Sequence, residues 1–409
     1  MLFPCSPHST FRVFCAVLAV SLLGAAASAQ SFDALETRLA DHPSLVALTY
    51  QADANRERSV AATALPDPVV SFGVNNFPVF DPSFSSYLPT NKALGISQSF
   101  PSRAGRQARS EEAGAMAEQM DRVRAAQRAT LRAELIALLH DKTRIARQRD
   151  LARLRGDKYD ELTKVIEAEI DAGRPAVFRL AEVDIERADV ARVLVDLQRD
   201  EAGIDARLID LVGIVPETEA PTIAPIDWSG KATDFHAVRV AESAIEIANS
   251  SVDGAEAAWK PNWGAQLTYQ QRESGAMFAG DDWVSGMVTF TVPLWSEQSQ
   301  APRLRAAKAD RASAEMRYQA SARSAAARYA AEAASWTAAK ETISVLSGNI
   351  SAVEDAIASQ LSLYESGAGS YAPIVDGEIS ILKLRADIAA EEARMAAAAA
   401  RMNALLVQP

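Results

Sequence analysis

The sequence of 409 residues predicts a mainly α-helical chain that carries a membrane β-barrel portion. Three observations predict this fold class. Two very long stretches contain no proline, four short runs alternate apolar with small or polar residues, and the whole pattern occurs twice along the chain. Together they indicate duplicated long antiparallel helical hairpins, each joined to a pair of β-strands.

The N-terminal residues 1–29 are typical of a secretory signal peptide. Arg12 precedes an apolar run over residues 13–23, and Ala27-Ser28-Ala29 forms an A-x-A site, so we expect cleavage near Ala29. The apolar run is short for a membrane span. Both cysteines of the chain lie inside this leader, so the mature protein is expected to hold no thiol and no disulfide.

Composition and motifs argue against an enzyme and against a nucleic-acid partner. The formal net charge is −11, and no cluster of Lys and Arg is interleaved with aromatic residues. No Ser-His-Asp or Cys-His arrangement and no phosphate-binding loop occurs. The mature histidines, His42, His140 and His236, are far apart in sequence and have no cysteine partners, so we expect no metal site and no cofactor.

Each proline-free stretch can hold one exceptional helix. Prolines are absent from residues 102–174 and 303–372, and a helix of about 60–70 residues is roughly 90–105 Å long. In the second stretch, apolar residues step by threes and fours until the run 366–373, where two glycines and a proline force a turn. The pattern then resumes, which predicts an antiparallel hairpin with one apolar seam. Its members are Trp336, Ile343, Leu346, Ile350, Val353, Ile357, Leu361 and Tyr364, then Ile381, Leu384, Ile388, Met395, Met402 and Leu405.

Landmarks of the first half recur in the second at an offset of about 192–195 residues, which indicates a tandem duplication. Leu65-Pro66 corresponds to Lys260-Pro261, and Phe100-Pro101 to Val292-Pro293. We therefore predict a first repeat at 30–214, a linker at 215–231 and a second repeat at 232–409. Each repeat is expected to hold a helix (about 32–64 and 232–258), a β-hairpin (67–101 and 261–293) and a long helical hairpin (103–213 and 303–406).

The four alternating runs have the length and pattern of outer-membrane barrel strands. Aromatic residues stand near their ends, where a membrane interface favours them. Four strands cannot close a barrel, and an open edge in lipid leaves backbone groups unpaired, so the protein must complete its barrel with copies of itself. The strand count alone leaves the number of copies open. The runs lie at about 70–74, 93–100, 263–270 and 284–292.

The duplicated plan over residues 32–406 resembles the TolC-like outer-membrane channel family. Tyr364, Gly367 and Asp376 match the family's tunnel-tip turn position by position, whereas Gly369 and Pro373 replace a basic residue and a first aspartate. The resemblance implies a homotrimer with a twelve-stranded barrel in the outer membrane of a Gram-negative cell. It also implies a helical tunnel that reaches through the periplasm.

Motifs around the strands resemble the heavy-metal efflux branch of that family, which serves cobalt–zinc–cadmium and copper–silver pumps. The motifs are Leu65-Pro66-Asp67-Pro68, the run 74–78 and Ser97-Gln98-Ser99-Phe100-Pro101. The resemblance implies a passive exit duct for small solutes, heavy-metal cations among them. Its partners would be a periplasmic adaptor protein, an inner-membrane pump of the resistance-nodulation-division type and outer-membrane lipid.

The candidate site residues cluster at the predicted tip. Asp376, Tyr364 and Glu378 are expected at the pore or gate. Asp376 can alternatively cap the returning helix, the tyrosine can pack in the seam, and Glu378 can be a solvated charge. The turn residues expected to dock the adaptor are Gly173, Pro175, Gly367, Gly369 and Pro373, and Gly367 is expected to need a positive φ.

Two other functions remain open from the sequence. The same architecture can serve as an exit duct for secreted polypeptide, as in type I secretion. A periplasmic coiled-coil scaffold without a pore is the third reading, and it predicts a mature protein that dissolves without detergent. The alternating strands instead predict that detergent is required.

Overall fold

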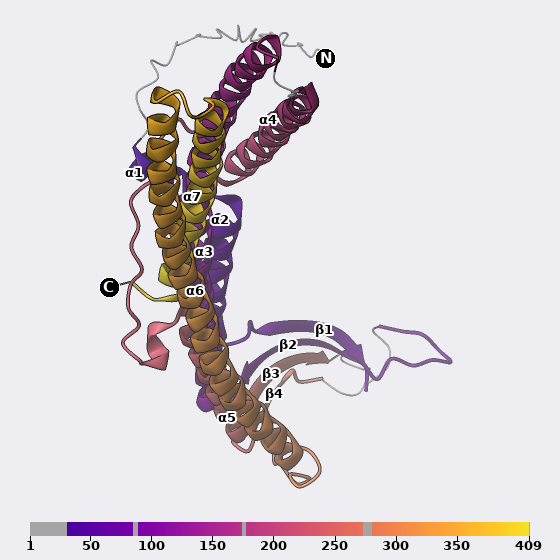
Figure 1. Ribbon diagram of the computed structural model, residues 1–409. Coiled ribbons are helices and arrows are strands. Elements are labelled where there is room, and N and C mark those ends of the chain that lie inside the picture. Colours follow the sequence, from indigo (N-terminus) through magenta and orange to yellow (C-terminus); the bar gives the residue numbers. More distant parts are fainter. Residues whose placement is uncertain (1–30, 85–88, 174–176, 273–279, 409) are drawn as a thin grey trace, which may run out of the picture.

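The computed structural model describes residues 31–84, 89–173, 177–272 and 280–408, and it is a long stack of helices from which a curved sheet projects (Figure 1). The expected leader and Pro175 lie outside the described residues. In chain order the elements are α1 (Phe32–Ala40), α2 (Pro43–Thr63), β1 (Val69–Asn75), β2 (Asn91–Phe100), α3 (Arg103–Asp171), α4 (Val177–Val212), the 3₁₀ turn η1 (Ala232–Asp234), α5 (His236–Ala257), β3 (Trp263–Arg272), β4 (Trp283–Phe290), α6 (Gln300–Glu365) and α7 (Ala372–Leu405).

One succession of elements occurs twice. A helix, two strands, a very long helix and a returning helix form α2-β1-β2-α3-α4, and the same order follows in α5-β3-β4-α6-α7. The predicted fold class is confirmed, since the chain is mostly helical with one four-stranded antiparallel sheet. Residues 215–231 between the two series contain no helix or strand.

The single helix predicted over residues 32–64 is wrong, because the chain forms two helices there. The first ends at Ala40 and the second begins at Pro43. Proline has no backbone N–H and disfavours helical geometry in the residue before it, so it starts a helix more readily than it continues one. The His42 ring accepts the Ser44 backbone N–H at 3.2 Å and caps the new helix.

The two long helices confirm the prediction from the proline-free stretches. Helix α3 has 69 residues, which corresponds to about 100 Å. It begins directly after Pro101, where Ser102 Oγ accepts the Gly105 N–H at 3.2 Å. Helix α6 has 66 residues and begins at Gln300, so Pro302 lies in its first turn, where its missing N–H would have no helical partner.

Helix α7 packs against two partners, not one. It contacts α3 as extensively as it contacts α6, so the predicted α6–α7 hairpin is not a separate body. Its buried residues are mostly alanine, which allows close approach: Ala400 packs with Ala133 and Ile136 of α3. The predicted seam is half-buried along α6, but Leu361 and Tyr364 near the tip are exposed in the single chain.

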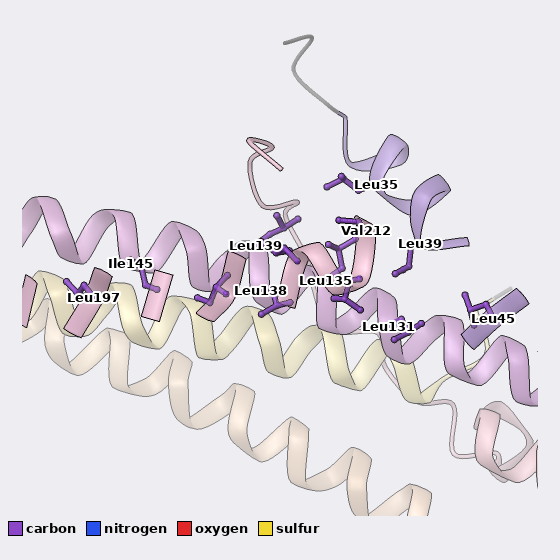
Figure 2. Packing of buried hydrophobic residues seen from close by; sticks show 13 residues of the cluster. Leu35, Leu39, Leu45, Leu131, Leu135, Leu138, Leu139, Ile145, Leu197 and Val212 are labelled. Carbon is purple, nitrogen blue, oxygen red and sulfur yellow. The ribbon is translucent and has the colours of Figure 1, made fainter. Parts of the chain in front are cut away.

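The largest core cluster lies midway along α3 and joins α1, the start of α2 and the end of α4 (Figure 2). Leucine predominates because it has high helix propensity and fills the holes between neighbouring helices. No described helix is both long and apolar enough to cross a membrane. The buried members are Leu35, Leu39, Leu45, Leu131, Leu135, Leu138, Leu139, Ile145, Leu197, Ile204, Leu208, Leu211 and Val212.

Candidate functional site

The sheet has one apolar face, and the strand register creates it. The strands are ordered β1-β2-β3-β4, and all neighbours are antiparallel. Directly paired residues share a face, so Phe72, Leu94, Tyr269 and Val284 lie in one row across the sheet. The face consists mainly of Val70, Phe72, Val74, Leu94, Ile96, Phe100, Trp263, Ala265, Leu267, Tyr269, Val284, Val288 and Phe290.

The opposite face carries mostly small and polar residues. Two glycines allow close packing there: a Cβ on Gly95 would stand 2.6 Å from Ser71 Oγ, and one on Gly264 would stand 2.6 Å from Thr289 Oγ1. A sheet that is apolar on one side and polar on the other fits between lipid and water. The polar members are Ser71, Asn75, Asn91, Ser97, Ser99, Gln266, Thr268, Gln270, Arg272, Ser285 and Thr289.

Both outer strands of the sheet lack a partner on one side. In the described chain β1 pairs only with β2, and β4 pairs only with β3. Their outward N–H and C=O groups would be unpaired inside a bilayer, where each unpaired group costs several kcal/mol. The sheet therefore requires another strand at each edge before it can enter lipid.

Glycines at positive φ end the two long helices at the tip. Gly367 has φ +76° and Gly173 has φ +81°. After α6, the Gly367 N–H bonds to Tyr364 O at 2.9 Å and the Ala368 N–H bonds to Leu363 O at 3.0 Å. These two bonds form a Schellman motif, in which glycine takes the left-handed position without a side-chain clash. The positive φ expected at Gly367 is therefore present.

The other predicted turn residues have different structural roles. A Cβ on Gly369 would lie 3.2 Å from Leu363 and Tyr364 backbone atoms, so glycine allows the turn to fold back on its helix. Pro373 lies in the first turn of α7 and not in the loop before it. Proline is compatible with that position, because the first helical N–H groups have no acceptor within the helix.

Asp376 joins two helices that come from different halves of the chain. Its carboxylate pairs with Arg179 of α4 at 3.0 Å. Burial raises the pKa of Asp376, and the nearby guanidinium opposes that shift. The alternative role as a helix cap is not observed, because Tyr371 is the N-cap residue and Asp376 lies beyond the first turn.

The second tip carboxylate also has a partner in its own chain. Glu378 pairs with Lys158 of α3 at 2.6 Å, and the same ammonium group lies 2.8 Å from Glu161. These carboxylates raise the pKa of Lys158, so it stays cationic. Helix α7 is thus bound by ion pairs to α3 and, through Asp376, to α4.

A third polar contact lies further from the tip along α4 and α7. Tyr159 is 4% exposed, and its hydroxyl donates to Glu186 of α4 at 2.5 Å. Lys383 of α7 donates to the same Glu186 oxygen at 3.1 Å. Glu186 therefore connects three helices through one carboxylate oxygen.

Two tyrosine rings contact each other in a tilted arrangement where the tip turn meets α7. The rings of Tyr364 and Tyr371 have centroids 5.3 Å apart and are tilted by 58°. Burial raises the pKa of Tyr371, and the Glu161 and Glu378 carboxylates raise it further. Tyr364 remains 47% exposed, so it is partly accessible to solvent at the tip.

The sequence patterns identified the α7 carboxylates but missed their partners. Arg179 and Lys158 lie on the first hairpin, and Tyr159 and Glu186 connect it to α7. One signal was available: Arg179–Asp376 and Glu186–Lys383 are both separated by 197 residues, close to the repeat offset. Opposite charges one repeat apart on equivalent helices are therefore a usable indication of such contacts.

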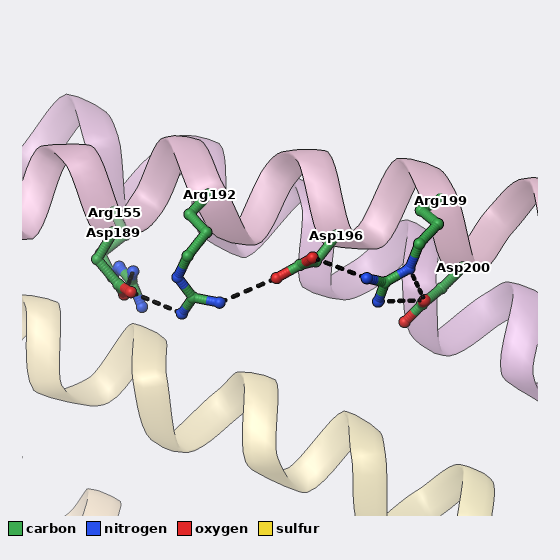
Figure 3. Close-up of polar contacts among 6 residues, drawn as sticks. All are labelled: Arg155, Asp189, Arg192, Asp196, Arg199 and Asp200. Atoms are coloured by element: carbon green, nitrogen blue, oxygen red, sulfur yellow. Dashed lines mark hydrogen bonds and ion pairs between the residues drawn. The ribbon is translucent and has the colours of Figure 1, made fainter.

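A ladder of alternating charges follows α4 away from the tip (Figure 3). It joins Asp189 to Arg192 at 2.7 Å, Arg192 to Asp196 at 2.9 Å and Asp196 to Arg199 at 3.1 Å. The Arg192 and Arg199 side chains are 65% and 71% exposed, so these pairs contribute little to stability. They give the open side of α4 a charged stripe of both signs. Arg155 of α3 connects to the ladder through Asp189 at 3.0 Å.

No group of three or more metal-ligating side chains occurs among the residues that the structure describes. The three histidines discussed above lie in different environments. His42 caps α2, the His140 ring contacts Pro221 O at 3.0 Å, and burial lowers the pKa of His236. In the part of the tip that the structure describes, the charged side chains form ion pairs and do not gather into a cluster of metal ligands.

The Glu186 contact predicts a pH-dependent stability. The Tyr159 hydroxyl and then Lys383 lower the pKa of Glu186 below its ordinary 4.5. A depressed folded-state pKa adds stability above the unfolded-state value, and this is lost as pH falls through the folded-state value. Glu186→Gln should therefore lower the melting temperature slightly at pH 7 and converge with wild type at strongly acidic pH.

Thermal unfolding at pH 7, 5 and 3.5 tests this prediction. Glu182→Gln is the matched control, because Glu182 is an exposed carboxylate one turn earlier on α4 with no ion pair among the described residues. A constant difference between Glu186→Gln and wild type at all three pH values would contradict it.

Residues 235–407 match the model of the outer membrane efflux protein family. This region covers the whole second series of elements, from the start of α5 to the end of α7. No curated protein matches the sequence.

Solved outer-membrane channels have the same fold as nearly the whole chain. VceC of Vibrio cholerae is 16% identical with a TM-score of 0.73, covering 91% of this chain and 95% of that chain. CusC is 15% identical with a TM-score of 0.74, covering 92% of each chain. The open state of MtrE of Neisseria gonorrhoeae is 17% identical with a TM-score of 0.71, covering 91% of this chain and 88% of that chain. At such low identity the likeness concerns the fold.

Proposed function

We propose that this protein is the outer-membrane channel of a tripartite efflux system. Three copies form a twelve-stranded barrel above a helical tunnel, and the tunnel tip meets a periplasmic adaptor and an inner-membrane pump of the resistance-nodulation-division type. The duct is passive and is not an enzyme. Its cargo is small solutes, and the motifs around the strands favour heavy-metal cations.

The observation that carries this proposal is the sheet with one apolar face and two open edges. A membrane barrel needs an apolar outer face and closed edges. Pairing β4 of one copy with β1 of the next supplies a partner for both edges at once. With four strands per chain, three copies give twelve strands, the number that the family resemblance implies.

The helices support closure of a ring by the same copies. They are arranged from the first repeat to the second repeat across the molecule, as the strands are. Toward the sheet the order of contacts is α2-α3-α5-α6, and toward the tip it is α4-α3-α7-α6. Helices of the first repeat therefore stand at one side and α6 stands at the other, as β1 and β4 do. The outer sides carry exposed apolar residues, among them Ile185 and Val195 on α4 and Met316 and Val345 on α6.

Such an arrangement makes a head-to-tail contact between copies. Joining the α4 side of one chain to the α6 side of the next uses two different surfaces, and this type of contact forms a ring when the rotation closes. In the alternative of a scaffold without a pore, the apolar face of the sheet would have no lipid to contact. The sheet therefore favours the channel.

At the tip, Asp376 and Glu378 combine two roles in this proposal. Three copies place these carboxylates in rings around a narrow opening, which favours cations over anions. Their ion pairs with Arg179 and Lys158 hold α7 against the first hairpin. The Gly173 and Gly367 turns form the surface that the adaptor meets.

Reconstituted channels provide the test at Asp376. Asp376→Asn removes one ring of charge, so the preference for cations over anions in planar bilayers should decrease about twofold or more. Asp387→Asn, an exposed α7 carboxylate with no ion pair among the described residues, should leave ion selectivity unchanged. Identical selectivity in Asp376→Asn and wild type would remove Asp376 from the pore.

Cargo is tested separately with a deletion strain. Increased sensitivity to cobalt, zinc, cadmium, copper or silver would support metal efflux, and sensitivity to organic compounds alone would contradict it. Loss of a secreted polypeptide, with metal and drug tolerance unchanged, would instead support the secretion duct.

A further inference from the structure

A cleft midway along α3 is lined by arginines and apolar residues that have no role in the proposed channel. It has a volume of about 610 Å³ and lies between α1, α2, α3 and the end of α7. This is the size of pocket that holds a small organic molecule. The cleft lies away from the tip and from the sheet.

Three arginines on successive turns of α3 line the cleft. Arg124, Arg128 and Arg132 follow at intervals of four residues, so they share one helix face. Like charges at this spacing repel one another and destabilise an isolated helix. An anion between them would remove that repulsion.

The described lining residues of the cleft carry fewer negative than positive charges. Among the described residues that line the cleft, Glu36 is the one carboxylate, and it is bound to Arg132. Arg124 is exposed and donates to the neutral Thr49 hydroxyl at 3.0 Å, and it makes no ion pair with a described residue. Arg128 makes no hydrogen bond or ion pair among the residues that the structure describes. Burial and the nearby Arg239 lower the pKa of His236, so its ring adds a neutral polar group.

The floor of the cleft is apolar. Ala129, Ala133 and Ile136 contribute from α3, and Ala400 and Leu406 contribute from the end of the chain. Ile136 is 2% exposed and Ala400 is also 2% exposed, so the floor is continuous with the core. A guanidinium group binds carboxylate or phosphate through two parallel N–H bonds, while an apolar floor favours a hydrocarbon body.

From this arrangement we propose that the α3 cleft binds an amphipathic anion, with an acidic head group against Arg124 and Arg128 and an apolar body on the alanine floor. A fatty carboxylate and a single-chain lipid phosphate share this chemistry. The site would be a second ligand position on the protein, separate from the conduit.

Calorimetric titration of the purified, assembled protein in non-ionic detergent tests the proposal. Octanoate should bind, and Arg128→Gln should weaken it about tenfold or more, because a charge-assisted hydrogen bond is lost. Octanol has the apolar body without the acidic head group, and inorganic phosphate has the anionic group without the apolar body. Each should bind at least tenfold more weakly than octanoate. The control is Arg153→Gln, an exposed α3 arginine outside the cleft, which should bind octanoate as wild type does.

A second variant tests the contribution of the apolar floor separately from that of the arginines. Ala129→Leu narrows the floor, so it should weaken octanoate and leave phosphate unchanged. Equal octanoate binding by wild type and Arg128→Gln would overturn the proposal, since it would indicate partition into detergent. Phosphate binding as tight as octanoate would also overturn it. Tight binding of octyl phosphate supports the proposal, and its ratio to octanoate identifies the head group.

Discussion

Leu267→Arg should prevent most of the protein from entering the outer membrane as a folded trimer. Leu267 lies at the middle of β3 on the apolar face, paired with Ile96 and Gly286. A cationic side chain on the lipid face near the bilayer midplane costs about 2–4 kcal/mol, and a trimer incurs this cost three times. The measurement is the amount of detergent-extracted trimer in the outer-membrane fraction.

The matched control is the next residue on the same strand. Thr268 points to the opposite face, toward Gly95 and Ser285, so Thr268→Arg should keep most of the trimer. The two substitutions add the same charge at the same depth and differ only in the face that carries it. Equal loss in both variants would show that the apolar face does not contact lipid.

Gly367→Val should have the largest effect at the tip. Gly367 has φ +76° and open space around it, so the cost arises from the backbone and not from a collision. For a residue with a Cβ, this left-handed backbone conformation costs about 1–2 kcal/mol of conformational free energy. A β-branched residue is among the least favoured there. We expect a displaced tip turn, weaker cross-linking to the adaptor and reduced resistance in cells.

Gly348→Val provides the comparison within helix α6, which precedes the turn. Gly348 is an exposed residue of α6 without a positive φ and without a neighbour within 4 Å of an added Cβ. Valine is a better helix former than glycine, so this change should be neutral or slightly stabilising. Wild-type adaptor cross-linking in Gly367→Val would show that the turn tolerates another geometry.

Local rules explain why much of the architecture was predictable. Helix length followed from the absence of proline, because proline removes an N–H and clashes in a helix interior. The turn at Gly367 followed from glycine and proline in a short polar run. Strand alternation followed from the period of two, which places Leu94 and Ile96 on one side and Gly95 on the other.

The wrong predictions concern the residues at which helices begin and end. At these positions, residues that favour starting a helix compete with residues that favour ending one. The break between α1 and α2 was missed, although Pro43 marks it, because the apolar pattern continues on both sides. Helix α6 started earlier than predicted, because Pro302 is tolerated in a first turn. Asp376 does not hold the N-cap position that was one of its expected roles, because Tyr371 occupies that position.

The sequence by itself determined the type and order of most elements, because these depend on periodicity and on residues that end helices. Only the tertiary structure decided what the elements face. It placed α7 between α3 and α6, brought Arg179 to Asp376 from 197 residues away and set apolar residues from the end of α7 beside the arginine face of α3. Such contacts depend on how helices pack against each other, and the pattern of a single helix carries no record of its neighbour.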